Sequence, residues 1–324
     1  MPLRTIQETL TGQVPAFVLD VNAPINPRPV QTWMMVDPKD VMYWQGFNLV
    51  NLRNAYGHIL DLPCPTCPVS DAHPRFLIQT LDELKQHGIE ALHHLLQRPL
   101  QYAISKLKQS LVCSKHDVLC DYKAPHTQID WIWGVFYAMD DTNFVVSCSR
   151  LSNTFTSEDL RLKKPDAIYT LRQLATYAAI GKTRYGFILT DKEVVIVRFH
   201  VKSQNVEEYA AGWVAIPWKE TGMYTLTAPL AVFSLIMMSL NDDHRQIVVG
   251  NNTLPLDAWI REKLWDGKVI FYHHLSGRCV NKLPEGVRFY WESKKKKKKK
   301  KRSAVSHVIT LARGLTEPLW NINE

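Results

Sequence analysis

The sequence lacks an apolar run long enough to cross a bilayer. Its most apolar stretch, PLAVFSLIMMSL from Pro229 to Leu240, has 12 residues, whereas a membrane-spanning helix needs about 20. The first fifteen residues also lack the apolar core of a secretory signal peptide. We therefore expect an intracellular chain that does not enter a membrane and that buries residues 229–240 as a helix in its own core.

Cysteine is also scarce. Six cysteines occur at irregular spacings in 324 residues, which is typical of reduced thiols rather than of a disulfide framework. The pair Cys64 and Cys67 has the spacing of a zinc knuckle, but the next pair, Cys113 and Cys120, is too widely spaced for one. Zinc on these four thiols would indicate a zinc-stapled DNA-binding protein, and we do not expect it.

Several common catalytic signatures are missing. The sequence contains no G-x-x-x-x-G-K-[ST], G-x-G-x-x-G, G-x-S-x-G or H-E-x-x-H. These patterns mark phosphate loops, dinucleotide sites, serine hydrolases and zinc proteases, respectively. The sequence therefore gives no support to those four classes.

Positive charge is concentrated near the C-terminus. The run from Lys294 to Arg302 supplies nine positive charges, and without it the net charge changes from +8 to −1. A near-neutral body does not predict general attraction to phosphate backbones. The run itself is typical of a nuclear-localisation or nucleic-acid-binding patch, or of a solvated low-complexity tail. Nucleic acid and a nuclear location are therefore expectations that depend on this segment, and the sequence predicts no particular protein partner.

The composition divides the chain into four parts. Residues 1–40 contain six prolines, which disfavour long regular elements and predict an extended arm. Residues 41–292 are expected to form the globular domain. The lysine-rich run at residues 293–302 then separates a tail, residues 303–324, that is too short to form a domain alone.

Apolar spacing predicts two helical regions in the first part of the domain. Leucines recur at helical intervals from Arg75 to Arg98, and a second amphipathic run begins at Leu100 after Pro99. Gly88 is expected to divide the first of these helices. A further helix is predicted at residues 167–180, with Asp166 as its N-cap and Gly181 as a left-handed C-cap.

Alternating apolar residues predict two hairpins around that last helix. The first joins residues 129–137 to 143–148 through Asp140-Asp141-Thr142, and the second joins residues 184–190 to 193–201. Residues 212–218 are expected to form an edge strand. The order helix, hairpin, helix, hairpin predicts an α/β fold with a mixed sheet flanked by helices.

Gln173 and Tyr177 are four residues apart, so both side chains project from one face of the predicted helix. The hairpin YGFILT-DK-EVVIVRF follows directly. The whole run RQLATYAAIGKTRYGFILTDKEVVIVRF resembles the second half of PD-(D/E)XK nuclease-like domains, particularly those of fungal proteins, and the resemblance extends over roughly residues 75–200. It implies a restriction-endonuclease-like core, here with a helical C-terminal extension, in which the Gln and Tyr support the active site.

The same resemblance implies a Mg²⁺ site for phosphodiester hydrolysis. In that family an Asp and a D/E-x-K pair converge on the metal, because hard carboxylate oxygens hold Mg²⁺ and the metal activates water. Two assignments compete in this sequence. In the first, Asp121 and Lys123 within CDYKAPH form the pair, with Asp121 as metal ligand and Lys123 assisting the water.

In the second assignment, Asp130 is the first acid and metal ligand, and the pair falls at Cys148 and Arg150. This fits the predicted order of strands better. A thiol does not replace a hard oxygen ligand, however, and arginine is not a general substitute for lysine. The sequence therefore predicts either a Mg²⁺-dependent nuclease or a catalytically impaired interaction module of the same fold.

Overall fold

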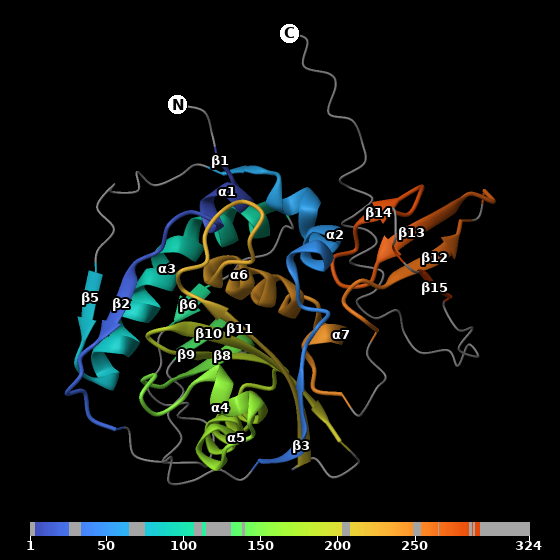
Figure 1. The fold of residues 1–324 in the computed structure, drawn as a ribbon. Coiled ribbons are helices and arrows are strands. Elements are labelled where there is room, and N and C mark those ends of the chain that lie inside the picture. Colours follow the sequence, from blue (N-terminus) through green and yellow to red (C-terminus); the bar gives the residue numbers. More distant parts are fainter. Residues whose placement is uncertain are drawn as a thin grey trace.

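A seven-stranded mixed sheet with helices on both faces forms the centre of the protein (Figure 1). The computed structural model describes residues 4–25, 34–64, 75–106, 112–114, 131–137, 140–202, 208–248, 254–264, 266–284, 287 and 289–291. The predicted α/β class with a mixed, helix-flanked sheet is confirmed. None of the described helices is long and apolar enough to span a bilayer.

The main sheet has the strand order β3-β11-β10-β9-β8-β7-β6. The parallel neighbours are β8 with β9 and β11 with β3, and the other neighbours are antiparallel. Its strands are β3 (Met35–Tyr43), β6 (Val112–Ser114), β7 (Trp131–Tyr137), β8 (Asp140–Ser149), β9 (Tyr185–Leu189), β10 (Glu193–Val201) and β11 (Glu208–Pro217).

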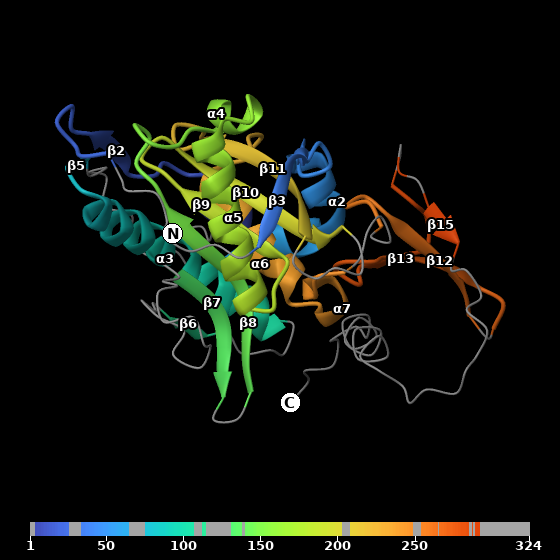
Figure 2. The same ribbon diagram turned by 90° about the horizontal axis from the view of Figure 1, so that it is seen from below.

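Helices cover the two faces of this sheet unequally. Figure 1 shows α6 above the strands and α4 and α5 below them, and Figure 2 shows α5 and α4 in front of the sheet. The larger apolar cluster joins one face to four helices: α1 (Ile6–Leu10), α2 (Leu49–Leu60), α3 (Leu81–Lys106) and α6 (Ala228–Ser239). The smaller cluster packs the other face against α4 (Ser157–Arg161) and α5 (Pro165–Ile180).

The buried helix predicted at residues 229–240 is α6. All twelve of its residues are buried, because it is enclosed by the sheet and by neighbouring helices. Thr227 caps its first turn by accepting a hydrogen bond from the backbone N–H of Leu230 (3.3 Å), and Pro229 lies within that turn, where its missing N–H is not needed.

The prediction that Gly88 and Pro99 interrupt the first long helix is wrong. Helix α3 runs unbroken from Leu81 to Lys106, and its leucines at positions 84, 92, 96 and 100 are all buried. Burial of this leucine face stabilises the helix by more than the hydrogen bond that Pro99 removes from it. At Gly88 a Cβ would lie 2.8 Å from Leu189 Cδ2, so glycine there permits close approach of the helix to β9.

Three further expectations are corrected. The first hairpin does not turn at Asp140-Asp141-Thr142, because these residues already pair with β7. Strand β11 is internal, since β3 pairs with it on the side away from β10. In the described part of the C-terminal extension, the helices are α6 and α7 (Asp242–Arg245). After that it forms a four-stranded sheet of β12 (Trp259–Lys263), β13 (Val269–His273), β14 (Cys279–Val280) and β15 (Phe289–Trp291).

The proline-rich N-terminal segment contributes to the folded body. Two small sheets anchor it, β1 (Arg4–Thr5) with β4 (Pro63–Cys64) and β2 (Ala16–Leu19) with β5 (Arg75–Ile78). Helix α1 buries Ile6 and Leu10 in the larger cluster. The boundary drawn at residue 40 falls inside β3, which is a strand of the main sheet.

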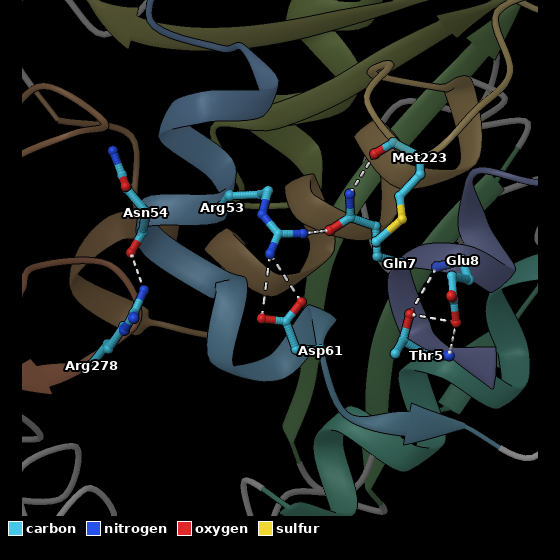
Figure 3. A network of polar contacts seen from close by, with 8 residues as sticks. All are labelled: Thr5, Gln7, Glu8, Arg53, Asn54, Asp61, Met223 and Arg278. Carbon is cyan, nitrogen blue, oxygen red and sulfur yellow. Dashed lines mark hydrogen bonds and ion pairs between the residues drawn. The ribbon is translucent and has the colours of Figure 1, made fainter. Parts of the chain in front are cut away.

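Polar contacts join these peripheral elements, as Figure 3 shows. Arg53 on α2 donates to Gln7 on α1 and forms an ion pair with Asp61 (3.0 Å). Gln7 donates in turn to the backbone oxygen of Met223 (2.7 Å). From the C-terminal sheet, Arg278 donates to a backbone oxygen of α2 (3.1 Å). Helix α2 therefore connects the N-terminal segment to the C-terminal sheet.

The ends of α5 differ from the predicted caps. The helix begins at Pro165, with Lys164 rather than Asp166 at the N-cap. At the other end Gly181 is right-handed (φ −71°), and the left-handed residue is Lys182 (φ 51°). A Cβ on Gly181 would lie 2.8 Å from Val146 Cγ1 and 3.2 Å from the backbone oxygen of Tyr177. Close packing, not backbone conformation, therefore requires this glycine.

We predict that Gly181→Ala lowers the free energy of unfolding by about 1–3 kcal/mol, because overpacking forces neighbouring atoms to shift. Gly57→Ala in α2 is the control, since its Cβ would meet only Arg278 Nη1, at 3.7 Å. Replacing a helical glycine by alanine should stabilise that variant by about 0.5–1 kcal/mol. Urea unfolding followed by tryptophan fluorescence measures both, and equal changes in the two variants would contradict the packing argument.

Candidate functional site

Helix α5 brings the predicted pair Gln173 and Tyr177 together. The Gln173 side-chain amide donates to the Tyr177 hydroxyl oxygen. Tyr177 is buried in the cluster between α5 and the sheet, whereas Gln173 is half-buried at the side of the helix. The i, i+4 spacing predicted from the sequence therefore produces a direct contact.

The end of β8 supplies the other half of the site. Cys148 is buried in the same cluster as Tyr177. Arg150 follows the last residue of β8, and its guanidinium donates to the Gln173 side-chain oxygen and to the backbone oxygen of Ser149 (3.0 Å). The structure thus joins Arg150, Gln173 and Tyr177 in one hydrogen-bonded chain, which we call the α5–β8 network.

Burial of Arg150 restricts which groups can lie next to it in this network. Arg150 is only 6% exposed, and a buried guanidinium needs acceptors for its N–H groups. Here those acceptors are an amide oxygen and a backbone oxygen. A fixed cation in this place favours an anionic group and disfavours a second cation such as Mg²⁺.

Two described acids hold the loop that follows Arg150 in place. Asp191 accepts hydrogen bonds from the backbone N–H and the hydroxyl of Ser152 (2.7 and 2.6 Å). Glu193 accepts equivalent bonds from Ser157 (2.6 and 2.8 Å). Both carboxylates therefore anchor the segment that leads from β8 to α5.

The sequence pattern places Asp191 in a hairpin turn and does not predict that its carboxylate holds the loop after β8. Asp191 is the one buried carboxylate among the residues that the structure describes. The available signal was the serine-rich segment after β8, since serine hydroxyls and backbone N–H groups commonly satisfy a buried acid.

The described residues of the α5–β8 network do not fit Mg²⁺. Magnesium is held by carboxylate oxygens and water, whereas the positions of the second assignment hold a thiol and a guanidinium. No group of three or more His, Cys, Asp or Glu side chains able to hold a metal occurs within the described part of the chain. Asp121, Lys123 and Asp130 lie outside the described residues.

The candidate zinc ligands are only partly described. Cys64 is buried in the larger core cluster, where burial raises the pKa of its thiol. Cys67 and Cys120, like the lysine-rich run, lie outside the described residues.

Comparisons of the chain with protein-family models, with curated proteins and with solved structures found no match to any of them.

We predict strong energetic coupling between Arg150 and Gln173. Removal of either partner leaves buried polar atoms of the other unsatisfied. The double variant Arg150→Met/Gln173→Leu should therefore lose about 1–3 kcal/mol less free energy of unfolding than the two single variants lose in sum. Chemical denaturation of the four proteins measures this coupling.

The exposed ion pair of Arg161 and Glu158 (2.5 Å) provides the control cycle. Its side chains are 63% and 57% exposed, so water and salt screen the charges and no measurable coupling is expected. Additive effects of Arg150→Met and Gln173→Leu would show that their hydrogen bond contributes nothing to stability.

Proposed function

We propose that the chain is a catalytically impaired PD-(D/E)XK-like protein that functions as a binding module rather than as a Mg²⁺-dependent nuclease. One observation carries this proposal: Arg150, buried and hydrogen-bonded to Gln173, occupies the end of β8 that faces the Gln-Tyr helix. In an active enzyme of that type, the same strand would present a carboxylate and a lysine.

The order of elements supports the resemblance. Helix α3 is followed by the antiparallel strands β6, β7 and β8, then by α5, and then by the hairpin of β9 and β10. It agrees with the order helix, hairpin, helix, hairpin that the sequence predicts, and the segment that carries the resemblance forms α5, β9 and β10. The α5–β8 network then corresponds to the position where that family supports its active site.

Chemistry disfavours hydrolysis at this position. Phosphodiester cleavage of this type needs metal-bound water, and hence oxygen ligands of net negative charge. Cys148 is a soft ligand enclosed in an apolar cluster, and the Arg150 cation repels a metal ion. The Arg150 guanidinium is instead bonded to Gln173 and Ser149, which supports a role for this position in holding the fold of a binding module.

Nucleic acid is the partner that we propose for the full chain. The lysine-rich run from Lys294 to Arg302 provides the charge for phosphate contacts, whose strength depends steeply on salt. The rest of the chain has a net charge of −1, so affinity that survives high salt would have to come from a local site. A nuclear location is proposed on the same run.

A Mg²⁺-dependent nuclease is the second candidate. Asp121-Tyr122-Lys123 retains the acid, spacing and lysine of the family's pair, and this observation alone favours it. Under this alternative, Asp121 or Asp130 binds the metal, Lys123 assists the water, and Gln173 with Tyr177 supports the site.

We predict that the purified full chain, incubated with single- or double-stranded DNA and Mg²⁺ or Mn²⁺, cleaves neither substrate and shows no Mg²⁺ binding by calorimetry. Anisotropy with labelled DNA should detect binding that weakens as salt rises. Asp121→Ala and Asp130→Ala are the matched variants. Cleavage that one of them abolishes would establish the nuclease and identify its metal ligand, and an absence of DNA binding would exclude the proposed partner.

A further inference from the structure

Two arginines, Arg184 and Arg198, lie beside Tyr185 on the other face of the main sheet. The Arg184 Cζ atom is 5.6 Å from the centroid of the Tyr185 ring, and the backbone oxygen of Arg184 accepts a hydrogen bond from the N–H of Phe199 (2.8 Å). Arg198 on β10 lies opposite Tyr185 on β9, and its Cζ lies 4.3 Å from the centroid of the Trp44 ring. Tyr185 and Trp44 belong to the larger core cluster, whereas the α5–β8 network borders the smaller one. The two sites therefore lie on opposite faces.

Arg184 is the more deeply buried of the two. It is 2% exposed, and its Nε and Nη2 atoms have no hydrogen-bond partner among the described residues. The Nε atom of Arg198 is also buried without a described partner, although the side chain as a whole is half-buried. Buried charged donors are rarely left unsatisfied in folded proteins.

The described acids do not neutralise these arginines. Burial, and then the charge of Arg184, lower the pKa of Arg198 from 12.5 to about 10, and burial also lowers the pKa of Arg184. Asp40, the acid that acts on neighbouring His200, forms an ion pair with Lys202 (2.8 Å). Arginine keeps its proton in folded proteins, so both side chains carry a positive charge. The two charges repel each other because burial limits their contact with water.

A further buried donor belongs to the same core cluster as Tyr185. Tyr56 on α2 is 2% exposed, and its hydroxyl has no described partner. Burial, followed by the effect of nearby Tyr185, raises the pKa of Tyr56 well above its usual value of 10. The phenol therefore keeps its proton and can donate it to a hydrogen bond.

We propose that Arg184 and Arg198 bind the terminal phosphate group of a phosphomonoester. A phosphomonoester carries nearly two negative charges and matches two cations, whereas a carboxylate would leave one uncompensated. Guanidinium groups bind phosphate oxygens through paired hydrogen bonds. A phosphate within a nucleic-acid chain, flanked by two nucleosides, cannot reach a side chain as buried as Arg184.

Calorimetry with the full chain tests this site, with inorganic phosphate, AMP and adenosine as ligands. We expect phosphate and AMP to bind and adenosine not to bind. Arg184→Met and Arg198→Met should each weaken phosphate binding at least tenfold. Arg53→Met is the matched control, because Arg53 is already paired with Asp61 and Gln7 (Figure 3) and should leave binding unchanged.

All of these variants keep the lysine-rich run, so phosphate binding that persists in Arg184→Met and Arg198→Met would overturn the proposal. A Kd of phosphate for the wild-type chain above about 1 mM would also overturn the proposal, because such weak binding does not indicate a specific site.

A second measurement needs no variant. Phenylglyoxal modifies accessible arginines, and mass spectrometry locates the adducts. Saturating phosphate should protect Arg198 and leave Arg53 unprotected, and it should raise the midpoint of thermal unfolding. Phosphate binding without protection of Arg198 would place the ligand elsewhere. Neither of these experiments measures DNA binding or DNA cleavage. A negative result for the phosphate site is therefore distinct from a negative result for the proposed binding module.

Discussion

The parallel pairing of β8 with β9 is the constraint on which the rest of the structure depends. Two parallel strands cannot be joined by a tight turn, so the chain must cross the sheet between them, and α5 provides that crossing. Gly186 permits the helix to lie close, since a Cβ there would be 3.0 Å from both Leu174 Cδ1 and the backbone oxygen of Val146. This contact places Gln173 and Tyr177 beside the end of β8.

That placement determines what the site can do. The residues of β8 in the cluster with α5 are Val146 and Cys148, and Arg150, which follows the strand, is bound to Gln173. Among the described acids, Asp191 and Glu193 are bonded to serines of the loop between β8 and α5. A network whose members satisfy one another contributes to stability and to a single packing arrangement.

The opposite face of the sheet holds arginines that lack such acceptors among the described residues. There Arg184 lies against the ring of Tyr185 and Arg198 against that of Trp44, and neither arginine forms an ion pair with a described carboxylate. Burying like charges together lowers stability, as sites that bind ligands commonly do. The two faces thus offer separate cationic positions, one satisfied by its own protein atoms and one suited to a ligand.

The sequence by itself determined the fold class, the second hairpin, the buried helix α6 and the contact between Gln173 and Tyr177, because each depends on local periodicity of 2 or 3.6 residues. Only the tertiary structure decided that α3 continues through Gly88 and Pro99, that Gly181 serves packing, and that β3 covers β11. It also decided that Arg150 meets Gln173 and that Arg184 lies near Arg198. These outcomes depend on contacts between residues distant in sequence, and local patterns carry no information about them.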